Sequence, residues 1–163
     1  MKKSKLLSCV LITHLVFLPA FVVSCSSNES TKNSEKPQLL NSTQIEQIKT
    51  SFQFDLTTEG KVYLQDKGIN ELNKIIENLN KQYKSDENAK YNNSGNKIQN
   101  DDTFKKYFYL QVVDIKKISK SHDIEFHFII NNQTKLIVLE YTVVCYDFPA
   151  PEIKNEQKPL ELD

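Results

Sequence analysis

The longest regular pattern of apolar residues lies in 68–84 and predicts an amphipathic helix. Its apolar side chains recur at spacings of three and four, so they form a single stripe with Lys, Glu and Asn on the other faces. The stripe consists of Ile69, Leu72, Ile75, Ile76, Leu79 and Tyr83. A stripe of this kind needs an apolar partner surface, and it is typical of a core helix rather than of a ligand groove.

A shorter helix is predicted before it, because apolar residues recur at i, i+3 and i+7 from Ile45 to Phe52. Thr43 can cap its N-terminus, and Glu46 stands three residues later, which is the spacing of a capping box. After Phe52 the residues alternate between apolar and polar, so the end of this helix is ambiguous. Val62 begins a further element in this interpretation.

From residue 104 to residue 148 the pattern changes to period two, which is typical of β-strands. Three strands are predicted, at about 105–118, 123–131 and 134–147. The first is apolar on both faces, with Tyr107, Tyr109, Val113 and Ile115 on one face and Phe108, Leu110 and Val112 on the other. If the domain is a subunit of a complex, the face of Phe108, Leu110 and Val112 is where an exposed apolar interface is expected.

The second and third strands alternate long enough to favour one register. A turn around 131–134 places Phe128 opposite Ile137, and the same register places Glu125 opposite Glu140. A shift of one residue would mix apolar and polar faces, which disfavours it. We therefore predict an α+β fold, with one or two helices packed on an antiparallel meander of three or more strands. This layout resembles that of cystatins in topology alone.

Two polar segments interrupt or follow these elements. Residues 85–103 contain one aliphatic side chain, Ile98, and this length suits either a functional loop or a disordered one. The composition favours disorder. Residues 149–163 are acidic and follow a Pro-Ala-Pro stop, so they are predicted to be a disordered tail. The sequence thus predicts a single domain over 39–148.

The N-terminus has the layout of a secretory signal over residues 1–24. Three lysines precede an apolar run of 18 residues, and Val22, Val23 and Ser24 stand directly before Cys25. This box resembles the bacterial lipobox, which implies cleavage between Ser24 and Cys25 and a palmitate-containing lipid on the Cys25 thiol. The alternative is a transmembrane helix, for which 18 interrupted residues are near the lower limit.

The resemblance implies a protein that is anchored by its lipid to the extracytoplasmic face of the cell membrane. Residues 25–38 carry almost no apolar side chain and are predicted to be a flexible tether. The Val-Val-Ser-Cys box, the lysine-rich start, the Ser/Asn/Lys-rich tether and the lack of Arg and Trp together resemble surface lipoproteins of mycoplasmas and related wall-less bacteria.

Charge and cysteine usage are consistent with that location. The chain has 21 basic and 21 acidic residues, and removal of the three lysines of residues 1–24 leaves 18 and 21, a net charge of −3. An acidic body has no electrostatic reason to bind nucleic acid. Cys145 would be the one cysteine besides Cys25 after cleavage, so no intramolecular disulfide is expected within the body.

Residue types suited to chemistry gather at His122, Asp123, Glu125 and His127. Glu125 and His127 project from the same face of their strand, and the predicted register adds Glu140, which makes these three weak candidates for a metal site. The simpler interpretation is a solvated sheet face. No catalytic residue, cofactor or HExxH-type motif is indicated.

Two classes of function therefore remain open at this point. The first is a non-enzymatic surface module that binds a protein or a host partner. The second is an accessory subunit of a membrane transport or secretion complex, or an anchored hydrolase.

Overall fold

The computed structural model describes residues 38–162 of the 163-residue chain, all of which belong to one compact unit. The predicted signal, Ser24, Cys25 and nearly all of the predicted tether lie outside the described residues. The described chain is an α+β domain, as the sequence predicts. No helix within 38–162 is long and apolar enough to span a membrane.

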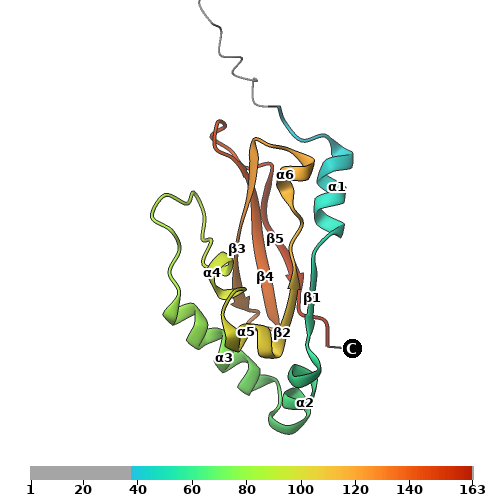
Figure 1. Ribbon diagram of the computed structural model, residues 1–163, viewed down its shortest axis with the longest axis vertical. Coiled ribbons are helices and arrows are strands. Elements are labelled where there is room, and N and C mark those ends of the chain that lie inside the picture. Colours follow the sequence, from blue (N-terminus) through green and yellow to red (C-terminus); the bar gives the residue numbers. More distant parts are fainter. Residues whose placement is uncertain (1–37, 163) are drawn as a thin grey trace, which may run out of the picture. The chain divides into compact units, whose positions relative to one another are not determined.

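Along the chain, helices and short strands come first, two long strands follow, and a shorter strand comes last (Figure 1). They are α1 (Ser42–Thr50), β1 (Gln53–Leu56), α2 (Thr58–Lys67), α3 (Ile69–Gln82), α4 (Gly95–Ile98), α5 (Asp102–Tyr107), β2 (Phe108–Gln111), α6 (Ile115–Ile118), β3 (His122–Ile130), β4 (Ile137–Cys145) and β5 (Ile153–Pro159).

Both helices predicted in the first half are present. α1 begins after Asn41, whose side chain accepts the backbone N–H of Gln44 while the Gln44 side chain accepts that of Asn41. This capping box replaces the one expected at Thr43. α3 follows Gly68, whose φ of 80° is a conformation that glycine adopts without strain, and this residue separates α3 from α2.

The main sheet is an antiparallel meander in the order β3-β4-β5, and β1 and β2 form a separate two-stranded sheet. The predicted faces of β3 and β4 are correct, but the register is displaced by two residues. Phe128 lies opposite Leu139 rather than Ile137. The physical reason is a turn that is two residues longer than expected, in which Asn131 accepts two backbone N–H groups and Lys135 adopts a φ of 59°.

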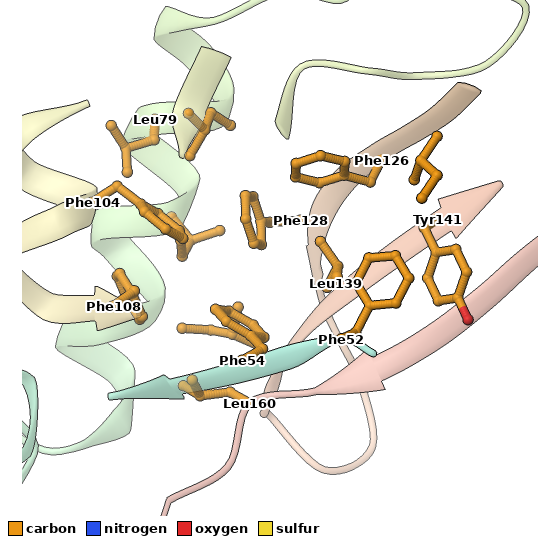
Figure 2. Close-up of a cluster of buried hydrophobic side chains, with 14 of the residues drawn as sticks. Phe52, Phe54, Leu79, Phe104, Phe108, Phe126, Phe128, Leu139, Tyr141 and Leu160 are labelled. Atoms are coloured by element: carbon orange, nitrogen blue, oxygen red, sulfur yellow. The ribbon is translucent and has the colours of Figure 1, made fainter. Parts of the chain in front are cut away.

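The inner face of the main sheet packs against α3, β1 and α5 to form an aromatic core (Figure 2). Phe54 of β1 lies at its centre, with ring centroids 5.4 Å from Phe128 and 6.2 Å from Phe108. Leu72, Ile76 and Leu79 of α3 are buried in the same cluster. Each such side chain contributes roughly 1.5–3 kcal/mol by its burial. The α3 stripe is therefore core, as predicted.

The strand predicted over 105–118 is wrong. Asp101 accepts the backbone N–H groups of Thr103 and Phe104 and so begins α5, which continues to residue 107. Phe104 and Phe108 are four apart and both buried, a spacing that suits a helical turn as well as a strand. Only 108–111 is a strand, and it pairs with β1 rather than with β3.

The polar segment 85–103 is folded, so the interpretation as a disordered loop is wrong. Ile98 is fully buried in the core. Asn93 is also buried, and its side-chain oxygen accepts from the backbone N–H of Asp86 and the hydroxyl of Ser85. Side-chain amides and hydroxyls here satisfy backbone groups that an apolar core would otherwise have to bury unpaired.

The predicted disordered tail is also wrong, because it contains β5, which pairs with β4. Ile153 and Leu160 are buried in the core and fix the strand at both ends. β5 contains Lys154, Lys158 and Pro159, and its pairing with β4 shifts register between Tyr141 and Val143; such features discourage an edge strand from pairing with another chain. The opposite edge, β3, is covered by α3 and α4 (Figure 1).

Candidate functional site

Glu125, the central member of the predicted cluster, is a buried structural carboxylate. Its side chain is 2% exposed on β3. One oxygen accepts the backbone N–H of Tyr91 at 2.6 Å, and the other accepts that of Lys90 at 3.2 Å and the hydroxyl of Tyr146. Burial and this hydrogen bond raise the pKa of Tyr146, so it stays a neutral donor. Glu125 holds the segment before α4 against β3.

The observed register places His127, not Glu125, opposite Glu140. Glu125 faces Thr142 instead, which corrects the predicted Glu125–Glu140 pair. The His127 Nε2 lies 3.6 Å from a Glu140 oxygen, and the second oxygen of Glu140 accepts from the Gln157 side chain at 2.9 Å. Burial lowers the pKa of His127, although Glu140 acts in the opposite direction.

His122 lies on the opposite, inner face of β3 and is fully buried. Its Nδ1 is 2.7 Å from the Ser119 hydroxyl, and its Nε2 bonds to Glu152. The second oxygen of Glu152 accepts the backbone N–H of Leu40 at 2.7 Å. The remaining residue of the cluster, Asp123, forms an ion pair with Lys116 at 2.8 Å.

The hydroxyl–imidazole–carboxylate order of Ser119, His122 and Glu152 has the residue types of a hydrolase triad. The imidazole, however, is 0% exposed, so no substrate can reach its ring. The chain of bonds instead ties the α6–β3 junction to the β4–β5 connection and to the first described residues. Neither Ser119 nor Glu152 was singled out from the sequence, because their contacts depend on strands paired far apart in the chain.

The predicted metal ligands do not converge on one position. Glu125 is bonded to backbone amides, while His127 and Glu140 form a pair of their own. Among residues 38–162, no group of three or more His, Cys, Asp or Glu side chains is arranged to hold a metal ion. Cys145 is buried without a disulfide partner.

An open hollow lies between α2 and α5, with a volume of about 360 Å³. We call it the α2–α5 hollow and define it by Thr58, Glu59, Val62, Tyr63, Asp66, Lys106 and Tyr107. Four of the α2 residues recur at i, i+3, i+4 and i+7, so they share one helix face. The sequence pattern did not reveal this face because it mixes aromatic, apolar and acidic side chains.

A second hollow of about 310 Å³ lies between the end of α3 and the segment that precedes α4. Its polar side chains are largely engaged by internal bonds. Asn80 donates to the carbonyl of Phe128 at 2.9 Å, Tyr83 donates to Asp101 at 2.8 Å, and Ser85 bonds to Asn93 at 3.0 Å. The α2–α5 hollow therefore offers more side-chain groups to a ligand.

The apolar face predicted at Phe108, Leu110 and Val112 is not a surface patch. Phe108 is 2% exposed in the core, and Leu110 and Val112 are partly buried against it. Comparison with protein-family models, with curated proteins and with solved structures finds no match for this chain.

Proposed function

We propose that this chain is a lipid-anchored, extracytoplasmic lipoprotein whose folded domain acts as a non-enzymatic binding module. The observation that carries the anchor is the Val22-Val23-Ser24-Cys25 box at the end of an apolar run that follows three lysines. In this proposal the lipid on Cys25 holds the domain at the cell surface, where it meets a protein or a host partner.

Binding is favoured over catalysis by how the polar groups of the domain are used. The residues with acid–base chemistry in the predicted cluster are bonded internally, and His122 is closed to substrate. An enzyme needs such groups to converge on an accessible pocket. The α2–α5 hollow instead presents tyrosines, carboxylates and an exposed valine, which suits recognition.

The second candidate, an accessory subunit of a transport or secretion complex, loses its main support. It relied on an exposed apolar face at Phe108, Leu110 and Val112, and these residues pack on the core. The hydrolase alternative loses support because the acid–base residues of the predicted cluster are bonded internally and His122 is buried.

Metabolic labelling with an alkyne analogue of palmitate tests the anchor. The wild-type protein should incorporate the label, and Cys25→Ser should abolish it. Cys145→Ser is the matched control, because it removes another thiol and should leave labelling unchanged. If Cys25→Ser still incorporates the label, the lipid is not attached to Cys25 and the proposed anchor is wrong.

Affinity purification of the intact lipoprotein from its own membrane, after mild cross-linking, tests the binding role. A soluble or surface-exposed partner supports a binding module. Reproducible co-purification with multi-spanning transport or secretion proteins would instead favour the accessory-subunit alternative.

A further inference from the structure

The α2–α5 hollow has a rigid floor. The backbone N–H of Thr57 donates to the carbonyl of Tyr107 at 3.1 Å, and its hydroxyl donates to the carbonyl of Lys106 at 2.5 Å. Gly60 of α2 is buried against the same place, because a Cβ there would lie 2.0 Å from the Tyr107 oxygen. These contacts hold the two helices together, so the backbone positions that carry the lining side chains are fixed relative to one another.

Two aromatic rings form the wall of this hollow. The centroids of Tyr63 and Tyr107 are 4.8 Å apart, with an angle of 47° between the rings. The ammonium group of Lys106 already lies 5.0 Å from the Tyr107 centroid. A tyrosine face in this geometry attracts cations, and an internal lysine makes use of that property here.

The charges of the hollow are not balanced internally. Glu59 and Asp66 stand on the lining face of α2, and neither takes part in an ion pair among residues 38–162. Lys106 supplies the one opposing charge of the lining. Val62 is 53% exposed beside these carboxylates, so the hollow also offers an apolar surface.

We infer that the α2–α5 hollow binds a lysine side chain presented by a basic segment of a partner protein. The ammonium group lies between the Glu59 and Asp66 carboxylates and the tyrosine faces, and the aliphatic stem covers Val62. Long basic side chains place an apolar stem on apolar surface while the charged end stays near water, which matches an open hollow of this composition. An acidic segment is disfavoured because it would meet two carboxylates.

The test uses the full-length lipoprotein in a non-ionic detergent and a fluorescein-labelled hexalysine peptide, with fluorescence anisotropy as the readout. Hexaglutamate is the peptide control. The Glu59→Gln, Asp66→Asn double variant should weaken hexalysine binding about tenfold, because two attractive charges are lost. Lys106→Gln should strengthen binding a few-fold, because the competing internal ammonium is removed.

The matched control is the Glu87→Gln, Asp147→Asn double variant, which removes two exposed carboxylates that are not part of the lining of the hollow. It should bind hexalysine within about twofold of wild type. Equal losses in the two double variants would show attraction by net charge alone and would overturn the inference. So would unchanged binding in the hollow variant, or a Lys106→Gln variant that binds more weakly.

Tetramethylammonium chloride forms the remaining arm of the experiment. If it binds the hollow while hexalysine does not, the site takes a small organic cation and the inferred protein partner is wrong. The inference rests on the proposal that the domain works by binding, yet the two fail separately. Loss of palmitate labelling concerns Cys25, whereas the peptide measurements concern only the hollow.

Discussion

Replacing Gly60 with alanine sets two effects of one methyl group against each other. In a helix interior alanine is favoured over glycine by roughly 0.5–1 kcal/mol. Here, however, the added Cβ would lie 2.0 Å from the Tyr107 oxygen and 3.2 Å from a methyl carbon of Leu56. The same oxygen accepts the Thr57 backbone N–H, so α2 cannot move away without weakening that bond.

The size of the effect follows from the distance that must be regained. An unstrained carbon–oxygen contact is roughly 3.3 Å or more, so the helices must separate by more than about 1 Å. Overpacking of this kind costs about 1–3 kcal/mol, and the weakened hydrogen bond adds about 1 kcal/mol. Together these two costs exceed the gain in helix propensity. The net expectation is a loss of about 1–3 kcal/mol in the free energy of unfolding.

Urea denaturation of the full-length protein measures this loss. Gln65→Ala is the control, because Gln65 is exposed on the same helix and its replacement should change stability by less than about 0.5 kcal/mol. A Gly60→Ala variant as stable as wild type, or more stable, would refute the close approach of α2 to Tyr107. It would also remove the rigid floor of the α2–α5 hollow.

Three further predictions concern the polar network. Glu125→Gln should lower the free energy of unfolding by about 2 kcal/mol in urea, because its NH₂ group would face donors that now meet a carboxylate oxygen; the exposed Glu87→Gln is the control. Asp101→Ala removes the cap of α5 and should cost about 1 kcal/mol. It should also lower the pKa of the Tyr83 phenol, which the hydrogen bond to Asp101 raises, in a spectrophotometric titration. Burial lowers the pKa of His127 from its usual 6.5, so the unfolded chain binds a proton more readily. Stability should therefore fall as the pH drops below about 6.5, and less steeply in His127→Gln, as measured by unfolding at several pH values.

Each of these has a clear contrary outcome. An unaffected Glu125→Gln would mean that the 85–94 segment is not held by this carboxylate. A Tyr83 pKa that is unchanged in Asp101→Ala would place the phenol away from the cap. Equal pH slopes for wild type and His127→Gln would show that His127 titrates alike in the folded and unfolded states.

The faces of β3 and β4 could be predicted because period-two alternation depends on nearby residues only. The register of these strands could not be predicted, because it depends on the turn that Asn131 and Lys135 shape between β3 and β4. A displacement of two residues preserves every face, so the hydrophobic pattern does not distinguish the two registers. That displacement was enough to exchange Glu125 for His127 as the partner of Glu140.

The candidate site was predicted from residue type, and that signal proved incomplete. Glu125 and His122 are chemically suited to catalysis, but their polar atoms form hydrogen bonds with residues from distant segments of the chain. The sequence shows neither the backbone amides of 90–91 nor the carboxylate of Glu152 beside them. The sequence did not predict the α2–α5 hollow, because tyrosines and acidic residues at helical spacing form no distinctive pattern.

The polar composition that predicted disorder in 85–103 is what allows this segment to fold beside β3. Its backbone N–H groups at Lys90 and Tyr91 are bonded to the buried carboxylate of Glu125. The Lys90 ammonium also donates to the carbonyl oxygens of Cys145 and Phe148, at 3.1 Å and 2.8 Å. Mean hydropathy cannot report such bonds, because they depend on a carboxylate 34 residues away in the chain from Tyr91.

Glu125 could hold only the segment 85–94 or could support the whole sheet, and the two roles predict different patterns of hydrogen exchange. In Glu125→Gln the amides of Lys90 and Tyr91 should lose protection against hydrogen exchange, because their acceptor is weakened. Amides in the β3–β4 ladder, such as that of Ile129, should lose only what the lower global stability requires. Hydrogen exchange followed by NMR distinguishes the two. Uniform loss across the ladder and the segment would show that Glu125 supports the sheet itself, and the segment 85–94 would then not be a separately held cover of β3.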